Sequence, residues 1–144
     1  MRLFLDVNML LYVVFNSYTE HEICRDWFEH VMDDTANRIG FPITALLGFV
    51  RLSTQSRSSF FPITMAQALE LVEGWVKQPN AYVPQPGDGH IEQVVNLLRS
   101  VNGNHALVTD AHLAALAIEH QATICSHDSD FKLFSALSVF DPLQ

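Results

Sequence analysis

Cysteine and basic residues are scarce in this chain of 144 residues, which has two cysteines and eight lysines and arginines. Cys24 and Cys125 can form at most one disulfide, so a disulfide-stapled secreted scaffold is excluded and a reducing cytoplasm is expected. Sixteen acidic residues against eight basic ones give a formal charge of -8, which argues against a protein that clamps duplex DNA by charge. Contact with nucleic acid would need a few local basic groups or a bound cation.

Long apolar segments and compositionally biased stretches are also missing. The most apolar stretch, Leu3–Phe15, contains Asp6 and Asn8 and is too short to cross a bilayer. The acid interrupts this stretch and no small-residue cleavage site follows, so we expect no signal peptide. No repeat or long linker divides the chain, and 49% of its residues are hydrophobic. We therefore predict a single globular domain over residues 1–144 and exclude a disordered chain.

Short apolar strands alternate with amphipathic helices along the chain. Strands are predicted where short apolar runs end at a polar residue or a turn, at Arg2–Asp6, Ile39–Phe41, Tyr82–Val83, Thr123–Cys125 and Ser138–Phe140. Helices are predicted at Asn8–Phe15, Glu20–Asp33, Ile43–Thr54 and Thr64–Lys77, from Asp88 through Leu98, from Thr109 through Ile118, and as one turn at Asp130–Phe134. This alternation predicts an α/β layer fold with a mainly parallel sheet.

The spacing of apolar residues also predicts which helix faces turn inward. In the helix over residues 20–33, the inward residues are expected to be Ile23, Trp27 and Val31. In the helix that begins at Asp88, they are expected to be Ile91, Val94, Val95 and Leu98. Thr64 is predicted to cap its helix.

Four aspartates stand where strands end or helices begin. Asp6 and Asp128 directly follow predicted strands, Asp130 lies two residues further on, and Asp110 opens a helix. Each alone has an ordinary structural explanation, because aspartate caps helices and makes turns. In open parallel sheets, however, ligands bind beyond the carboxyl ends of the strands, so Asp6, Asp110 and Asp128 are predicted to converge there. Crowded carboxylates repel one another, and a divalent cation such as Mg²⁺ relieves that repulsion.

Three segments of the sequence resemble one protein family. They are LDVNMLLY at Leu5–Tyr12, LVTDAHLAALAIEHQATICSHDSDF at Leu107–Phe131 and DPL at Asp141–Leu143. Together they resemble a PIN-domain ribonuclease of the VapC type, the toxin of a bacterial toxin–antitoxin pair. The resemblance implies a three-layer α/β/α sandwich and a magnesium- or manganese-dependent endonuclease acting on RNA. It also implies a homodimer and a small antitoxin protein as partner.

The same resemblance assigns roles to individual residues. The catalytic and metal-binding acids would be Asp6, Asp110 and Asp128, with Asp130 as a neighbouring acid. Asn8 matches a position that holds a small polar group near the family's site, and Thr109 is expected in a similar supporting place. The chemistry implied is metal-assisted hydrolysis, in which a cation activates water and offsets charge on the leaving oxygen. No histidine, serine or cysteine nucleophile is required.

One position departs from the family pattern. Many members carry a glutamate in the helix after the second strand, as a further acid of the metal pocket. Here that helix reads ITALLGFVRLST, Gly48 stands at the expected glutamate position, and no acid occurs between Asp34 and Glu70. We therefore expect a metal site with one carboxylate fewer, and a carboxylate installed by Gly48→Glu should tighten metal binding.

Basic and metal-ligating side chains elsewhere give weaker signals. Arg51, Arg57 and the loop Ser56–Phe61 combine arginine with aromatic residues, which suits contact with RNA or a protein partner. An ordinary solvated loop explains them equally well. A zinc site is suggested by four histidines, but their spacings match none of the usual zinc patterns. These are His105, His112, His120 and His127.

Two other functions fit parts of the pattern. A phosphate-handling hydrolase or phosphoacceptor could use Asp6 as its nucleophile. However, a haloacid dehalogenase would have a second aspartate two residues after Asp6, and Asn8 stands there instead. A receiver domain would need a lysine near the late strands, but the only late lysine, Lys132, comes after the acid pair. The third possibility is a non-catalytic PIN-like binding module, in which Gly48 marks a weakened metal site.

Overall fold

A parallel sheet forms the centre of the molecule. The computed structural model describes residues 1–57 and 59–144, and within them the strand order is β3-β2-β1-β4-β5. Every neighbouring pair in this order is parallel. The strands are β1 (Arg2–Leu5), β2 (Arg38–Gly40), β3 (Ala81–Tyr82), β4 (Thr123–Cys125) and β5 (Ser138–Phe140). The predicted α/β fold with a parallel sheet is therefore confirmed.

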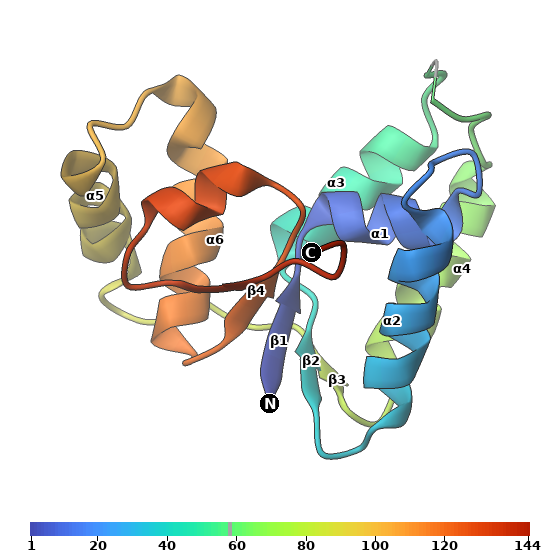
Figure 1. The fold of residues 1–144 in the computed structure, drawn as a ribbon, viewed down its shortest axis with the longest axis horizontal. Helices are drawn as coiled ribbons and strands as arrows, with labels where there is room; N and C mark the ends of the chain where they lie inside the picture. Colours follow the sequence, from blue (N-terminus) through green and yellow to red (C-terminus); the bar gives the residue numbers. More distant parts are fainter. Residues whose placement is uncertain (58) are drawn as a thin grey trace.

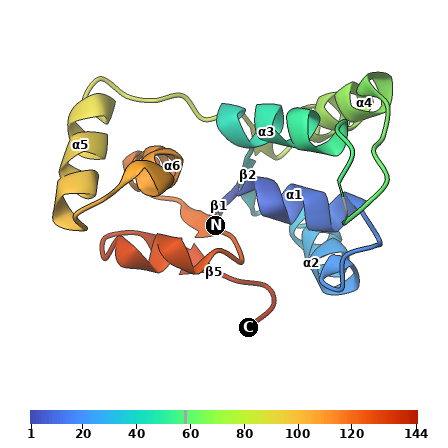
Figure 2. The same ribbon diagram turned by 90° about the horizontal axis from the view of Figure 1, so that it is seen from above.

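Helices cover both faces of the sheet and complete a three-layer α/β/α sandwich (Figure 1). One side carries α1 (Val7–Val14), α2 (His21–Asp33), α3 (Ile43–Ser53) and α4 (Met65–Val76). The other side carries α5 (His90–Ser100) and α6 (Val108–Glu119), with the 3-10 turns η1 (His105–Leu107) and η2 (Ser129–Leu133) next to α6. Figure 2 shows the two groups of helices separated by the strands. None of the helices in the described residues is both long enough and apolar enough to cross a membrane.

Alternation along the short strands builds one apolar core on each face of the sheet. Leu3 and Leu5 of β1 belong to the core beneath α1–α4, whereas Phe4 belongs to the core beneath α6. All three side chains are buried. A strand covered on both faces needs apolar residues at successive positions, which is why β1 has a continuous apolar run.

Gly40 allows the ring of Phe4 to lie against the second strand. The two residues are register partners in the parallel pair β1–β2. A Cβ atom at Gly40 would collide with the Phe4 ring, and Phe4 is fully buried. Any larger residue at position 40 would displace this ring, so glycine is needed here for close approach.

The predicted elements all occur, and their ends differ from the predicted ones by at most two residues. The cap is confirmed, because Thr64 and Gln67 form a capping box at the start of α4. Two of the predicted helix faces are partly wrong. In α2, Ile23 is 55% exposed while Cys24 and Phe28 are buried, and in α5, Ile91 is 73% exposed. The predicted loop around residues 56–62 includes position 58, which lies outside the described residues.

The two cysteines are free thiols of the core. Cys24 and Cys125 are both buried. Burial raises the pKa of Cys24 to about 11 and that of Cys125 to about 12, so both thiols stay protonated at neutral pH. They are therefore packing residues rather than nucleophiles.

Candidate functional site

A small acidic hollow lies beyond the carboxyl ends of β1 and β4. Its volume is about 130 Å³, and α1, α3, α6 and the loop after β4 contribute residues to its lining. Five side chains that the sequence suggested for a site are among them, namely Asp6, Asn8, Thr109, Asp110 and Asp128. The other lining residues are Val7, Thr44, Ala45 and Leu113. The parallel sheet thus brings together acids that are more than a hundred residues apart in the chain.

Asp6 lies at the junction of β1 and α1. Its Oδ1 accepts a 2.7 Å hydrogen bond from the backbone N–H of Val7, which caps α1. Its Oδ2 accepts a 2.7 Å hydrogen bond from the hydroxyl of Ser126. Burial raises the pKa of Asp6 above its ordinary value, the hydrogen bonds from Ser126 and Val7 oppose this shift, and Asp128 adds to it. Asp6 therefore has the structural role of a cap and a place in the acidic hollow at once.

Asp110 lies in the first turn of α6 and does not cap that helix. The α-helix begins at Val108, directly after the 3-10 turn η1, and its cap position Leu107 offers no side-chain hydrogen bond. The capping explanation for Asp110 is therefore wrong. Burial, followed by repulsion from Asp128, Asp6 and Asp130, raises the pKa of Asp110 to about 7. This carboxyl group therefore gains or loses its proton near neutral pH.

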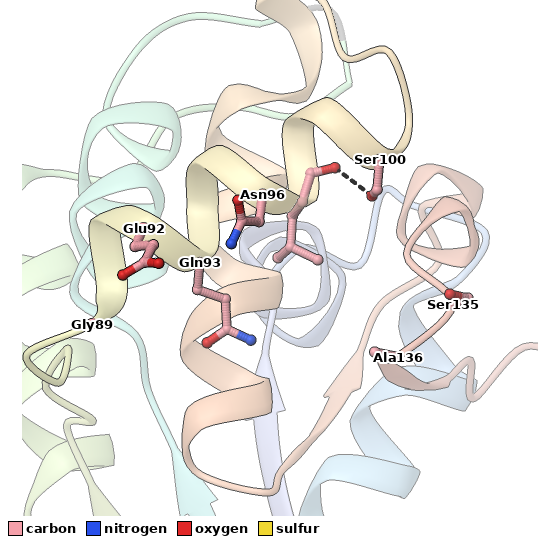
Figure 3. A pocket seen from close by; sticks show the side chains of 8 residues that line it. Gly89, Glu92, Gln93, Asn96, Ser100, Ser135 and Ala136 are labelled. Carbon is pink, nitrogen blue, oxygen red and sulfur yellow. Dashed lines mark hydrogen bonds between the residues drawn. The ribbon is translucent and has the colours of Figure 1, made fainter.

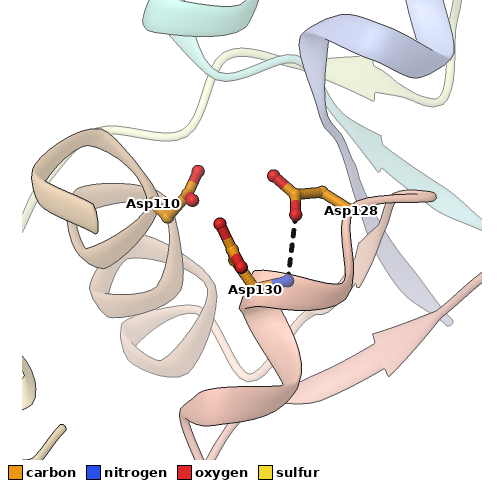
Figure 4. A group of neighbouring side chains, drawn as sticks. All are labelled: Asp110, Asp128 and Asp130. Carbon is orange, nitrogen blue, oxygen red and sulfur yellow. Dashed lines mark hydrogen bonds between the residues drawn. The ribbon is translucent and has the colours of Figure 1, made fainter. Parts of the chain in front are cut away.

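Asp128 and Asp130 face Asp110 across the hollow (Figure 4). Asp128 Oδ1 accepts a 2.9 Å hydrogen bond from the backbone N–H of Asp130 and so caps η2. One carboxylate oxygen from each of Asp110, Asp128 and Asp130 lies within 4.8 Å of the other two. Among the described residues, these three acids form the group of side chains that could hold a metal ion. Asp6 lines the same hollow without belonging to this group. The acid expected only as a neighbour, Asp130, thus lies in the cluster, and Asp6 lies beside it.

Ser126 connects two of the acids and was missed in the sequence. Its side chain is buried, its hydroxyl donates to Asp6 Oδ2, and its Oγ accepts a 3.0 Å hydrogen bond from the backbone N–H of Asp128. Ser126 directly follows β4, just as Asp6 directly follows β1. A polar residue directly after a buried strand was the signal that identified Asp6, and the same signal could have identified Ser126.

The segment DPL near the end of the chain is tied to the loop that carries Asp128. Asp141 Oδ2 lies 2.8 Å from Nδ1 of His127, and Asp141 Oδ1 accepts a 2.9 Å hydrogen bond from the backbone N–H of Leu143. The Asp141 side chain is only 8% exposed, whereas His127 is partly open to solvent. This buried carboxylate therefore holds the residue next to Asp128 and gives the segment a positioning role.

Gly48 lies beside the hollow but does not line it. The lining residues of α3 are Thr44 and Ala45, and Thr44 is one helical turn before Gly48. A Cβ atom at position 48 would lie 3.3 Å from Cγ2 of Val7, which does line the hollow. No carboxylate from α3 is among the described residues that line the hollow, as the sequence suggested.

The two candidate contact arginines are not among the residues that line the hollow. Arg51 is exposed in the last turn of α3. The guanidinium of Arg57 lies 5.9 Å from the ring centroid of Phe60, which is buried, whereas the next residue, Phe61, is 94% exposed. A role for Arg51 and Arg57 in contacting RNA or a partner stays a prediction.

Three of the four histidines that suggested zinc have separate partners. His112 lies 2.7 Å from Nε2 of His90, and Nε2 of His120 lies 2.8 Å from the carbonyl oxygen of Gln85. His127 pairs with Asp141. The one potential metal group within residues 1–57 and 59–144 contains aspartates alone, so the zinc alternative has no support there.

Comparison with known proteins decides the family. The PIN domain family matches residues 3–137, which is nearly the whole chain and includes Asp6, Asp110, Asp128 and Asp130. The chain belongs to the PIN-domain family. This PIN domain is 37% identical over 142 residues to Ribonuclease VapC33 of Mycobacterium tuberculosis, with 96% of each chain covered. It is also 37% identical over 132 residues to Ribonuclease VapC37 of the same organism, with 92% of this chain and 91% of the relative covered.

Solved structures show the same PIN fold. VapBC-1 from nontypeable Haemophilus influenzae superposes on the whole of this PIN domain with a TM-score of 0.71 at 15% identity, and both chains are fully covered. VapBC2 from Rickettsia felis, bound to a DNA fragment from its promoter, gives a TM-score of 0.70 at 14% identity over 98% of both chains. At these identities the likeness establishes the architecture alone.

Proposed function

We propose that this PIN domain is a metal-dependent endoribonuclease, the toxin of a toxin–antitoxin pair, which hydrolyses RNA phosphodiester bonds with Mg²⁺ held by carboxylates. The observation that carries the proposal is the cluster of Asp110, Asp128 and Asp130, whose oxygens lie within 4.8 Å of one another. The names of the relatives, ribonucleases of the VapC type at 37% identity, support the choice of RNA as substrate.

The donor set of the cluster fits a hard divalent cation. Carboxylate oxygens are the ligands that Mg²⁺ and Mn²⁺ prefer, and Mg²⁺ needs only one or two of them because it keeps several waters. Burial and then repulsion from the neighbouring acids raise the pKa of Asp110, and a bound cation would offset both effects. Asp110, Asp128 and Asp130 would hold the cation, and Asp6 would add negative charge from beside them.

The catalytic contribution of the chain is to hold these oxygens in place. When bound, Mg²⁺ supplies the acidity that activates a water molecule and the positive charge that stabilises the leaving oxygen. Ser126 fixes the carboxylate of Asp6 and the backbone of Asp128, and the pair of His127 and Asp141 holds the same loop. Asn8 and Thr109 offer polar groups on the wall of the hollow, where they can orient water or phosphate.

The phosphoacceptor alternative is less well supported. Asp6 is only 5% exposed, and each of its two oxygens already accepts a hydrogen bond, so it is poorly placed as a nucleophile. Lys132 donates to Oε1 of Gln144 over 3.3 Å on an exposed surface and is not among the residues that line the hollow. A binding module without catalysis stays the second candidate, because α3 contributes no acid.

The proposal extends to partners and location. The family resemblance implies a cognate antitoxin protein and a homodimer, and the exposed Arg51 and Arg57 are our candidates for contact with RNA or with a partner. The free thiols of Cys24 and Cys125 agree with a cytoplasmic location.

A nuclease assay separates the candidates. Structured and unstructured RNA are incubated with the purified chain in the presence of Mg²⁺, of Mn²⁺, or of excess EDTA. Under our proposal RNA is cleaved internally with either metal and is left intact with EDTA. Binding of RNA without cleavage under every metal condition would favour the binding module. Release of phosphate from a small phosphomonoester, with RNA left intact, would favour the phosphoacceptor.

A further inference from the structure

A second hollow lies at the other end of β1 and β2, where these two strands begin. It has a volume of about 410 Å³ and is lined by Arg2, Arg38, Tyr82 and His120. Arg2 begins β1 and Arg38 begins β2, and the two residues are register partners in the parallel pair. Because Asp6 follows the carboxyl end of β1, the length of the strand, roughly 13 Å at about 3.3 Å per residue, separates this hollow from the acids.

Contacts within the protein hold both arginines in place. A guanidinium nitrogen of Arg2 donates a 2.8 Å hydrogen bond to the carbonyl oxygen of His120, at the end of α6. The guanidinium of Arg38 lies over the ring of Tyr82, 4.6 Å from its centroid. Tyr82 and His120 in turn pack on the buried ring of Phe4. The lining of the hollow therefore combines two aromatic rings that pack on the core with two positive charges.

No carboxylate of the described residues neutralises these two charges. The ion pairs of the described chain involve Arg25, Lys77, His90 and His127, and neither Arg2 nor Arg38 takes part in one. Burial raises the pKa of the Tyr82 phenol, and Arg2 and Arg38 both oppose that rise, which places their charges close to the same phenol. In a chain with a formal charge of -8, Arg2 and Arg38 stand out because they are register partners that line one hollow.

Another hollow of the molecule has a similar volume but a different charge. A hollow of similar volume, about 440 Å³, lies between α5 and the segment after η2 (Figure 3). Its polar lining consists of uncharged side chains and the carboxylate of Glu92, with no arginine or lysine. An anion would be repelled there, whereas the hollow of Arg2 and Arg38 attracts one.

We propose that the hollow formed by Arg2, Arg38, Tyr82 and His120 binds a phosphate group. Two guanidinium groups provide planar sets of N–H donors that match the oxygens of a phosphate, and the phenolic hydroxyl of Tyr82 can add a further hydrogen bond. The phosphate can come from the backbone of an RNA strand or from a free nucleotide. The site shares no residue with the acidic hollow, so phosphate binding there does not depend on the proposed cleavage activity.

The test measures binding without metal and without cleavage. Inorganic phosphate is titrated into ¹⁵N-labelled protein in metal-depleted buffer at constant ionic strength, and the side-chain N–H resonances of the arginines are followed by NMR. We expect saturable shifts of the Arg2 and Arg38 resonances. Arg38→Gln should weaken binding by about tenfold, because a hydrogen-bonded charge is lost. Arg25→Gln is the matched control, since it removes the same charge from an exposed arginine of α2 and should leave the affinity within about twofold.

Several results would overturn the proposal. One is that Arg38→Gln and Arg25→Gln change the phosphate affinity equally. Another is that the resonances of Arg25 and of Arg99, which is exposed in the last turn of α5, shift as much as those of Arg2 and Arg38. The third is that no resonance shows a saturable shift. If thermal unfolding shows that Arg38→Gln is misfolded, Arg38→Lys keeps the charge, removes the planar donors, and should weaken binding several-fold.

Two further probes identify the source of the phosphate. They are uridine 5′-monophosphate and a short RNA without terminal phosphates. Tighter binding of the monophosphate would indicate a free nucleotide, and tighter binding of the RNA would indicate a nucleic-acid backbone. If Arg38→Gln no longer binds one of these probes, the binding of that probe is assigned to this hollow. Retention of both in Arg38→Gln would overturn the proposal.

Discussion

Ser126 donates a 2.7 Å hydrogen bond to Asp6 although the two residues are 120 positions apart in the sequence. The bond joins the end of β4 to the end of β1, and these strands are neighbours in the sheet. The same hydroxyl oxygen accepts from the backbone N–H of Asp128. One buried serine therefore links two acids of the hollow and fixes how they lie relative to each other.

Removal of this hydroxyl should weaken the site while leaving the fold intact. Ser126→Ala deprives Asp6 of a hydrogen bond that opposes its raised pKa, so we expect that pKa to rise further. Loss of such a supporting bond typically reduces metal affinity by about 10- to 100-fold. Calorimetric titration with Mg²⁺ checks this, with Ser129→Ala as the control because Ser129 is exposed at the start of η2, three residues after Ser126. Equal affinities of the two variants would show that Ser126 has no positioning role.

Asp110→Asn should abolish RNA cleavage and keep the protein folded. The amide is of nearly the same size, and Asp110 does not cap α6, so no structural hydrogen bond of the helix start is lost. The charge that would hold the cation is removed, and a metal ion supplies several kcal/mol of transition-state stabilisation, so we expect cleavage to fall by about a hundredfold or more. Cleavage rates and circular dichroism measure the two effects. Asp33→Asn, at the exposed end of α2, controls for the change in net charge, and unchanged cleavage by Asp110→Asn would remove this residue from the site.

The metal-free protein should lose stability as the pH rises toward 7. The pKa of Asp110 is about 7 in the folded protein against an ordinary value of 3.8, so the folded state binds this proton more tightly than the unfolded state does. The Asp110 carboxyl group therefore makes its full contribution to the free energy of unfolding below about pH 4. This contribution is lost as the pH rises to about 7. Urea unfolding at pH 5 and pH 8 measures the change.

Asp110→Asn serves as the reference for this pH dependence, because it retains the raised pKa of Asp6 and lacks that of Asp110. We expect the variant to become more stable relative to the parent protein as the pH rises. Added Mg²⁺ should stabilise the parent protein more at pH 8 than at pH 5, since the cation competes with the proton. Parallel pH profiles of parent and variant would contradict the raised pKa.

The sequence was sufficient for the architecture because each strand and helix carries its own periodic signal. The run from Leu3 to Leu5 identified a strand buried on both faces, and Thr64 identified the start of α4. Helix faces were harder to predict, since the apolar face of α2 is broad. Ile23 and Cys24 both belong to that face, and the tertiary fold buries Cys24 while it leaves Ile23 exposed.

The acidic hollow was only partly predictable, for a different physical reason. A residue that follows a strand can be recognised from local sequence, and this identified Asp6 and Asp128. The bond from Ser126 to Asp6 depends on which strands are neighbours, and strand order is a property of tertiary packing rather than of local sequence. The pair of His127 and Asp141 likewise exists only because β5 lies beside β4.

The missing glutamate of α3 leads to the last prediction, that Gly48→Glu tightens Mg²⁺ binding. Position 48 lies one turn after Thr44, which lines the hollow, so a Glu side chain there would start next to the lining. Each added carboxylate favours a hard divalent cation, so we expect an increase in affinity of several-fold by calorimetry. The new Cβ would lie 3.3 Å from Cγ2 of Val7, and this side chain must yield by a few tenths of an ångström.

Gly74→Glu is the matched control for that experiment. Gly74 is exposed in α4, and apart from its chain neighbours and the backbone of its own helix no heavy atom lies within 4 Å of where its Cβ would be. This variant should gain only helix propensity, from a few tenths to about 1 kcal/mol of stability, with unchanged metal affinity. The difference in unfolding free energy between the two glutamate variants then measures the cost of moving Val7. A Gly48→Glu variant with unchanged metal affinity would show that position 48 does not reach the site. A sharp loss of stability would show that glycine is there for close packing between α1 and α3.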